Sequence, residues 1–223
     1  MAIDKLANVR RLSFIDRVIG SADEMLKTFA GGKQLESSRP SPADQLESQN
    51  ESINDQQRVH TAALMRVNHT GEVCAQALYR GQSLSAKSES VRRSMMAAAA
   101  EEEDHLVWCE KRIHELGSHT SYLNPLWYAM SFSMGALTGI LSDKISLGFV
   151  AATEEQVCKH LNEHYEQIPG GDLKSRAILE QMLIDENSHA EHAIDEGGLN
   201  FPGVVKQSMT VLSKAMTGSS YHL

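Results

Sequence analysis

The sequence predicts an all-helical protein built as a four-helix bundle, and three observations lead to this fold class. Proline and aromatic residues are sparse, at five prolines and 5% aromatics in 223 residues, while the helix-favouring Ala, Leu, Glu and Gln are common. Two helical hairpins flank a long uncharged stretch. Each hairpin carries a lone glutamate followed some 30 residues later by a Glu-x-x-His pair, which is the ligand pattern of dinuclear metal sites in helix bundles.

The first 54 residues differ in character from the rest of the chain. Residues 1–30 mix charged and apolar positions without a continuous apolar core, which predicts an amphipathic helix and not a secretory signal. This helix could be an ordinary surface helix, or it could dock on a membrane surface or a partner. Residues 31–54 are polar and contain Gly-Gly and Ser-Pro breaks, so we expect a flexible linker. The chain is therefore divided into residues 1–54 and a helical domain of residues 55–223.

The bundle helices are predicted from the breaks between them. Pro169-Gly170-Gly171 separates the second pair, and Gly197-Gly198 ends it. A short terminal helix follows Pro202. The expected helices span roughly residues 55–84, 88–116, 146–167, 172–196 and 204–216.

Residues 116–142, between the two hairpins, contain no Asp, Glu, Lys or Arg. Ser, Thr and Gly interrupt this stretch too often for a transmembrane helix, which needs about 20 predominantly apolar residues. One interpretation is a buried crossover between the hairpins, as in ferritin-like bundles. The other is a surface that enters one leaflet of a bilayer, with Trp127 and Tyr128 near the headgroups. The two interpretations are compatible.

Charge and cysteine content exclude several classes of function. The formal net charge is -8, with 29 acidic and 21 basic residues, which argues against nucleic acid as the main partner. The three cysteines show no short paired spacing, so neither a disulfide framework nor a structural zinc site is predicted. A reducing cytoplasm is the simpler fit.

The candidate metal ligands come from the spacing of glutamate and histidine. Residues three apart share one face of a helix, so each Glu-x-x-His pair can present both side chains together. Such a pair is common by chance in a chain this rich in Glu and His, and the further support comes from the two lone glutamates upstream. The six candidates are Glu72, Glu102, His105, Glu154, Glu186 and His189.

Helix geometry predicts that these side chains lie at one level. Glu72 and Glu102 each lie roughly 20 Å from the turn that joins their helices, at 1.5 Å per residue. Glu154 and Glu186 are placed similarly around the second turn. Four carboxylates and two imidazoles form an oxygen-rich set that suits iron or manganese. Glu101 and Asp185 are candidates to accept the free ring N–H of the histidine from the opposite hairpin. The alternative for both is an exposed position at the surface, which we favour for Glu101.

Several motifs closely resemble the demethoxyubiquinone hydroxylases, the non-flavin monooxygenases of ubiquinone biosynthesis. Residues 64–79 (LMRVNHTGEVCAQALY) resemble the first ligand helix of that family. The runs EEEDHL, NPLW and VAATEE, and Asp185-Glu186 with His189, match in the same order. The resemblance covers about residues 56–220. Carried over by position, the iron ligands of the family fall on Glu72, Glu102, His105, Glu154, Glu186 and His189.

This resemblance implies a ferritin-like fold with two iron ions, associated peripherally with the cytoplasmic face of a bacterial cell membrane. The implied substrates are O2 and a polyprenyl benzoquinol that lacks one methoxy group. One oxygen atom would enter the ring and the other would leave as water, with electrons from a reduced nicotinamide or from the quinol. The membrane surface and other enzymes of quinone biosynthesis are implied partners, and nucleic acid is not.

The chain departs from the family in two places, and two alternative functions remain open. The polar leader of residues 1–54 lies outside the core match, and we assign it no catalytic role. Animal members carry His-His-Tyr where this chain has Lys159-His160-Leu161, so the electron-relay role of that tyrosine cannot be transferred, although Tyr79 or Tyr165 could substitute. His164 is expected at the surface.

The alternatives to the hydroxylase function are another ferritin-like function, such as an iron oxidase or peroxidase, and a non-catalytic quinone-binding scaffold.

Overall fold

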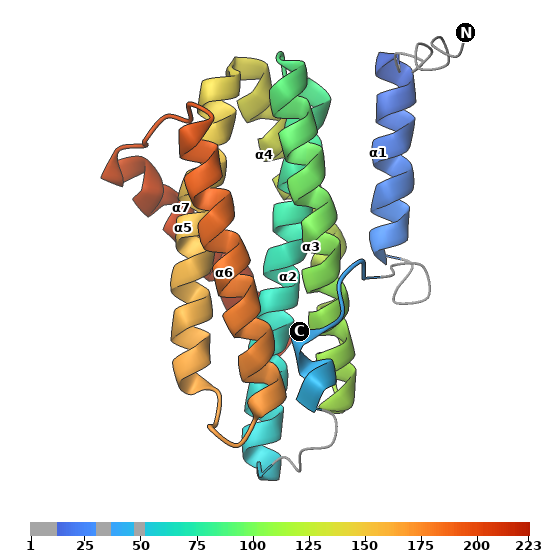
Figure 1. The fold of residues 1–223 in the computed structure, drawn as a ribbon, viewed down its shortest axis with the longest axis vertical. Coiled ribbons are helices and arrows are strands. Elements are labelled where there is room, and N and C mark those ends of the chain that lie inside the picture. The colour runs from blue at the N-terminus through green and yellow to red at the C-terminus, as the bar shows by residue number, and fades with distance from the viewer. Residues whose placement is uncertain (1–12, 30–36, 47–51) are drawn as a thin grey trace, which may run out of the picture.

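The computed structural model describes residues 13–29, 37–46 and 52–223, and these residues form helices without a strand. Four long helices run side by side as the bundle (Figure 1). They are α2 (Asp55–Ser85), α3 (Glu89–Glu115), α5 (Asp143–Gln167) and α6 (Leu173–Asp195). Around them lie α1 (Phe14–Phe29), the short 3-10 helix η1 (Pro42–Leu46), α4 (Asn124–Leu141) and α7 (Gly203–His222). The predicted all-helical four-helix bundle with extra terminal helices is confirmed.

Local sequence signals fix the ends of the bundle helices. Asn54 begins α2 with a reciprocal capping box to Gln57, and the Asp172 side chain accepts the backbone N–H of Ser175 at the start of α6. Gly197, at a φ of 98°, follows the end of α6 in a backbone conformation that favours glycine. The predicted bounds of the four bundle helices therefore agree with the observed ones to within three residues, whereas the terminal helix continues to His222, six residues beyond its predicted end at residue 216.

Two apolar clusters fill the bundle and leave a polar layer between them. One cluster includes Met65 of α2 and Met182 of α6, and the other includes Tyr79 of α2 and Ala193 of α6. In both helices the predicted metal ligands lie between these positions along the chain. The core therefore holds the candidate site in a rigid layer that apolar packing closes on both sides.

The uncharged stretch forms α4, which packs along α2 at very close range. A Cβ added at Gly81 would collide with the backbone carbonyl of Phe132, and one added at Gly135 would collide with that of Leu78. Both glycines are therefore required for the contact. The opposite side of α4 leaves Leu126, Leu137, Ile140 and Leu141 exposed. The crossover interpretation is therefore confirmed, because α4 packs along α2. Entry into one leaflet of a bilayer stays a prediction, and the expected position of Tyr128 near the headgroups is wrong, because this residue is buried.

The first 54 residues are only partly described. Residues 1–12 of the predicted amphipathic helix lie outside the described residues, and α1 packs its Met25 and Phe29 on the bundle. Residues 37–46, which we call the strap, lie within the predicted flexible linker. The strap packs on the bundle through buried Ala43, and its Asp44 pairs with Lys111 of α3 at 2.6 Å. This part of the predicted linker therefore has defined partners on the bundle.

Candidate metal centre

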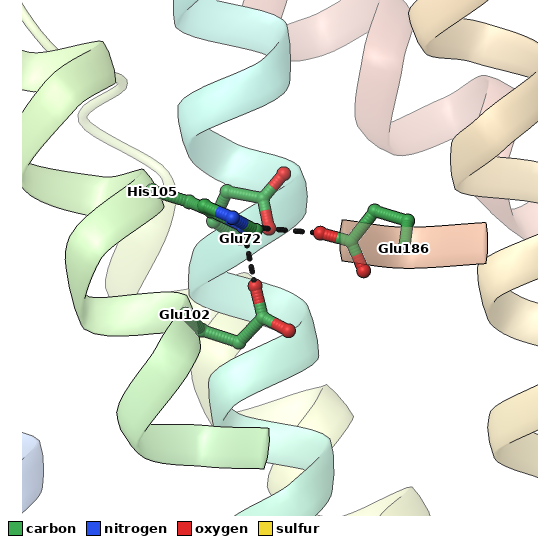
Figure 2. A group of neighbouring side chains, drawn as sticks. All are labelled: Glu72, Glu102, His105 and Glu186. Carbon is green, nitrogen blue, oxygen red and sulfur yellow. Dashed lines mark hydrogen bonds and ion pairs between the residues drawn. The ribbon is translucent and has the colours of Figure 1, made fainter. Parts of the chain in front are cut away.

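Four predicted ligands converge in the buried layer of the bundle. Figure 2 shows Glu72 of α2, Glu102 and His105 of α3, and Glu186 of α6 pointing toward one another. One potential ligand atom from each lies within 4.8 Å of those of the others, and all four residues are buried. The Nδ1 atom of His105 lies 3.1 Å from Glu102 Oε2 and 3.0 Å from Glu186 Oε1. The cluster therefore draws on three different helices of the bundle.

His189 of α6 adjoins the same carboxylates from the other side. Its Nδ1 atom lies 3.4 Å from Glu102 Oε1 and 3.1 Å from Glu186 Oε2. Glu102 and Glu186 thus each present one oxygen to His105 and the other to His189. These two carboxylates lie between the two histidines. This arrangement follows from the Glu-x-x-His spacing, which occurs once in each hairpin.

Glu154 of α5 is buried near this cluster and is held by Tyr79 of α2. The Tyr79 hydroxyl donates to Glu154 Oε1 at 2.6 Å. The Tyr79 ring also meets the His189 ring edge to face, with centroids 6.2 Å apart. Of the two tyrosines considered above, Tyr79 thus lies at the site, whereas the Tyr165 hydroxyl bonds Glu180 in an exposed position.

Each histidine is held through its other ring nitrogen by a carboxylate from the opposite hairpin. His105 Nε2 lies 3.0 Å from Asp185 Oδ2, and His189 Nε2 lies 2.9 Å from Glu101 Oε2. Because an ionised carboxylate only accepts hydrogen bonds, Nε2 of each ring carries the proton. The Nδ1 atoms face the glutamates, and loss of the Nδ1 proton leaves the lone pair with which metal-binding histidines coordinate. These two contacts confirm the predicted pairing of Glu101 and Asp185.

In the metal-free chain, burial and the negative charges of the layer shift the pKa values of its side chains. Burial raises the pKa of Glu72 well above its usual value, and the negative charges of Glu102 and Glu186 raise it further against the opposing effect of His105. Burial and the same two negative charges also raise the pKa of Glu154. For His189, burial opposes protonation, but its hydrogen bonds to Glu102 and Glu186 raise the pKa to about 12. Protons therefore compensate the buried carboxylates when no metal does.

The hydrogen-bond inventory of these carboxylates fits a cation site. One oxygen of each of the four glutamates is buried and receives no well-aligned hydrogen bond from the described residues, and a histidine Nδ1 lies 3.4 Å from that oxygen of Glu102 and 3.0 Å from that of Glu186. A buried charge costs roughly several kcal/mol unless it is paired or coordinates a metal. The unpartnered oxygens are Glu72 Oε2, Glu102 Oε1, Glu154 Oε2 and Glu186 Oε1.

Two cavities reach the cluster from different directions. The first, of about 320 Å³, lies between α2, α4, α5 and α7, and Glu72 lies in its wall. Apolar side chains make up most of its lining, including Leu78, Met134 and Phe149. The second is a cleft between α3 and α6, and its wall includes His189. The Glu72 side of the site therefore faces an apolar chamber, and the His189 side faces a cleft.

Sequence reasoning located the cluster but missed two of its neighbours. The sequence suggests Tyr79 only as a substitute for the tyrosine that this chain lacks, and no sequence pattern links it to Glu154. Arg39 of the strap pairs with Asp185 at 2.9 Å, and nothing in the polar linker indicated this contact. His160 of α5 lines the first cavity.

The fold and the cluster together define the class of this protein as a ferritin-like helical bundle with a buried cluster of carboxylates and histidines suited to a metal. The sequence profile described as "Ubiquinone biosynthesis protein COQ7" matches residues 59–220, and the chain belongs to this family.

Curated relatives cover almost the whole chain. A protein of Pseudomonas fluorescens (strain Pf0-1) is 58% identical over 217 residues, which are 96% of this chain and 98% of the relative. A protein of Ectopseudomonas mendocina (strain ymp) is 57% identical over 221 residues, covering 98% of this chain and all of the relative. Both are described as "3-demethoxyubiquinol 3-hydroxylase". The family resemblance read from the motifs is thereby confirmed.

Proposed function

We propose that this chain is a 3-demethoxyubiquinol 3-hydroxylase that holds two iron ions in its buried cluster. The observation that carries the proposal is the meeting of that cluster with the apolar cavity at Glu72. The proposed ligands are the six predicted residues: Glu72, Glu102, His105, Glu154, Glu186 and His189. Membership of the family and the relatives described as hydroxylases support this reaction over iron storage or a scaffold role.

Iron fits the donor set on chemical grounds. Four carboxylates carry about as much negative charge as two divalent cations carry positive charge, and oxygen-rich sets suit iron better than thiolate sites do. The unpartnered oxygens of the four glutamates would then have partners. Bound iron would supply the redox chemistry that activates O2. The two electrons that reduce the second oxygen atom to water would come from a reduced nicotinamide or from the quinol. The hydroxylation replaces one ring C–H with C–OH and releases the second oxygen as water.

The residues around the cluster would bind and orient the quinol. The apolar wall of the first cavity accepts an aromatic ring and excludes water, which suits a reaction beside a buried metal site. A ring in this cavity lies next to the Glu72 side of the cluster. On the opposite side, Asp185 and Glu101 keep the two histidines in fixed orientations by accepting their Nε2 protons.

The polyprenyl tail of the substrate requires a route to lipid. Exposed apolar residues gather on the two helices that flank the cavity, Leu126, Leu137 and Leu141 on α4, and Val204 and Val211 on α7. No helix in the described part of the chain combines the length and apolar character needed to cross a bilayer. We therefore propose peripheral attachment through α4 and α7, on the cytoplasmic face of a bacterial membrane.

Charged substitutions on α4 should release the protein from membranes. We expect the double substitution Leu137→Glu and Leu141→Glu to weaken binding to phospholipid vesicles roughly tenfold or more, because each leucine loses about 1.5–3 kcal/mol of apolar burial. Flotation with vesicles measures the bound fraction. Val59→Glu, at an exposed apolar position on α2, is the matched control. Equal flotation of the double variant and the control would contradict this mode of attachment.

Isotope incorporation tests the proposed reaction directly. The iron-loaded protein is supplied with a reductant, a demethoxyquinol analogue and labelled O2, and mass spectrometry follows the ring product. We expect one labelled oxygen in the ring and none when iron is omitted. Consumption of O2 with iron oxidation but without ring labelling would instead support the iron-oxidase alternative.

A further inference from the structure

The strap is fastened to α3 at the residue that precedes His105. Asp104 is almost completely buried and accepts hydrogen bonds from three consecutive strap residues. Its Oδ1 atom accepts from the Ser37 hydroxyl at 2.9 Å and from the Ser38 backbone N–H at 2.6 Å, and its Oδ2 atom accepts from Arg39 Nε at 2.7 Å. This anchoring fixes the direction in which the Arg39 side chain leaves the strap.

Arg39 reaches from this anchor to the carboxylate that holds His105. Its Nη2 atom lies 2.9 Å from Asp185 Oδ2, the same oxygen that accepts from His105 Nε2 at 3.0 Å. Arg39 Nη2 is also only 3.5 Å from His105 Nε2. The guanidinium lies over the Trp108 ring, 5.0 Å from its centroid, which restricts its position further. One planar group therefore joins two carboxylates on two helices, Asp104 of α3 and Asp185 of α6.

We propose that Arg39 is a positioning residue for the metal centre, acting through Asp185 on His105. The guanidinium holds Asp185 Oδ2 in place, so the carboxylate accepts the Nε2 proton of His105 and directs Nδ1 toward Glu102 and Glu186. This inference rests on the proposed function, because it assumes that Nδ1 of His105 binds iron. It assigns a role to a residue that lies outside the matched residues 59–220.

The corresponding contact at the other histidine is built differently. His189 Nε2 bonds to Glu101, whose side chain is 52% exposed, whereas that of Asp185 is only 12% exposed. His189 also faces the cleft between α3 and α6, while the strap lies over the His105 side. The two histidines therefore differ in the rigidity of their support. Loss of Arg39 should act on the iron that His105 holds and leave the other largely unchanged.

Stepwise Fe(II) binding to the whole chain tests this role without measuring turnover. The variants are Arg39→Gln and Arg39→Lys, titrated with Fe(II) alone under anaerobic conditions, with circular dichroism to confirm folding. We expect Arg39→Gln to weaken one of the two Fe(II) binding steps roughly tenfold or more, as loss of a partner that orients a ligand does. Arg39→Lys should give an intermediate value, because one ammonium cannot reproduce the planar fork that joins both carboxylates.

A second strap contact provides the control. Lys111→Gln removes the ion pair to Asp44, which ties the strap to α3 away from His105. This variant should bind both Fe(II) ions as the unaltered chain does. Unchanged Fe(II) binding in folded Arg39→Gln, or an equal loss in Lys111→Gln, would overturn the positioning role. Absence of Fe(II) binding by the unaltered chain would instead refute the proposed metal centre itself, so the two failures are distinguishable.

Discussion

Replacement of Glu186 by alanine should abolish both iron binding and hydroxylation. Glu186 lies between the two histidines, 3.0 Å from His105 Nδ1 and 3.1 Å from His189 Nδ1, so its loss removes a carboxylate from both sides of the cluster. We expect the content of bound iron to fall from two ions toward zero. The hydroxylation rate should fall roughly 10³-fold or more, because a catalytic metal contributes several kcal/mol to the transition state. Iron analysis and product formation measure the two effects.

The same substitution should not destabilise the metal-free chain. Glu186 is completely buried, and the desolvation cost of its carboxylate offsets its ion pairs with the two histidines in the metal-free fold. We expect iron to raise the melting temperature of the unaltered chain, because it binds only the folded state, and to leave that of Glu186→Ala unchanged. Glu191→Ala, at an exposed position on the same helix, is the control for both measurements. Normal iron content in Glu186→Ala would contradict the proposed ligand set.

The helices and the convergence of the candidate ligands could be predicted because local signals encode both. Asn54, Pro169 and Gly197 mark helix ends through capping and backbone geometry. The spacing of the Glu-x-x-His pairs then determines which side chains share a face, and the similar distances of the two glutamates in each hairpin from the connecting turn determine their level. Both depend on distances along one helix, which the sequence states directly.

Contacts between distant segments could not be predicted in this way. Arg39 meets Asp185 across 146 positions of the chain, and its polar, Ser-Pro-containing surroundings are also typical of a linker. The expected surface position of His164 is wrong, because this residue is buried and its Nδ1 atom lies 2.6 Å from Asn68 Oδ1 on α2. In each case the partner depends on how helices pack, and periodicity within one helix carries no information about that partner.

A glycine in the middle of α2 provides the sharpest test of the substrate cavity. Gly71 lies next to Glu72 in the wall of the apolar cavity, and a Cβ added there would meet no atom within 4 Å. Glycine inside a helix costs about 1 kcal/mol relative to alanine, and Gly71 makes no close backbone contact that would require it. Its small size leaves room beside the cluster. We therefore expect the space at Gly71 to be occupied by the quinol ring.

Larger side chains at this position should block the quinol without disturbing iron. We expect Gly71→Leu to lower kcat/KM for the quinol roughly 10- to 100-fold, because overfilling a well-packed site costs about 1–3 kcal/mol, and Gly71→Ala to have a smaller effect. Iron content should stay at two ions, and the melting temperature should hold or rise because both residues favour helix more than glycine does. Gly20→Leu on α1, where a Cβ also meets nothing within 4 Å, controls for this helix effect. Full activity of Gly71→Leu would place the substrate elsewhere, whereas lost activity with lost iron would show that the substitution had disturbed Glu72 instead.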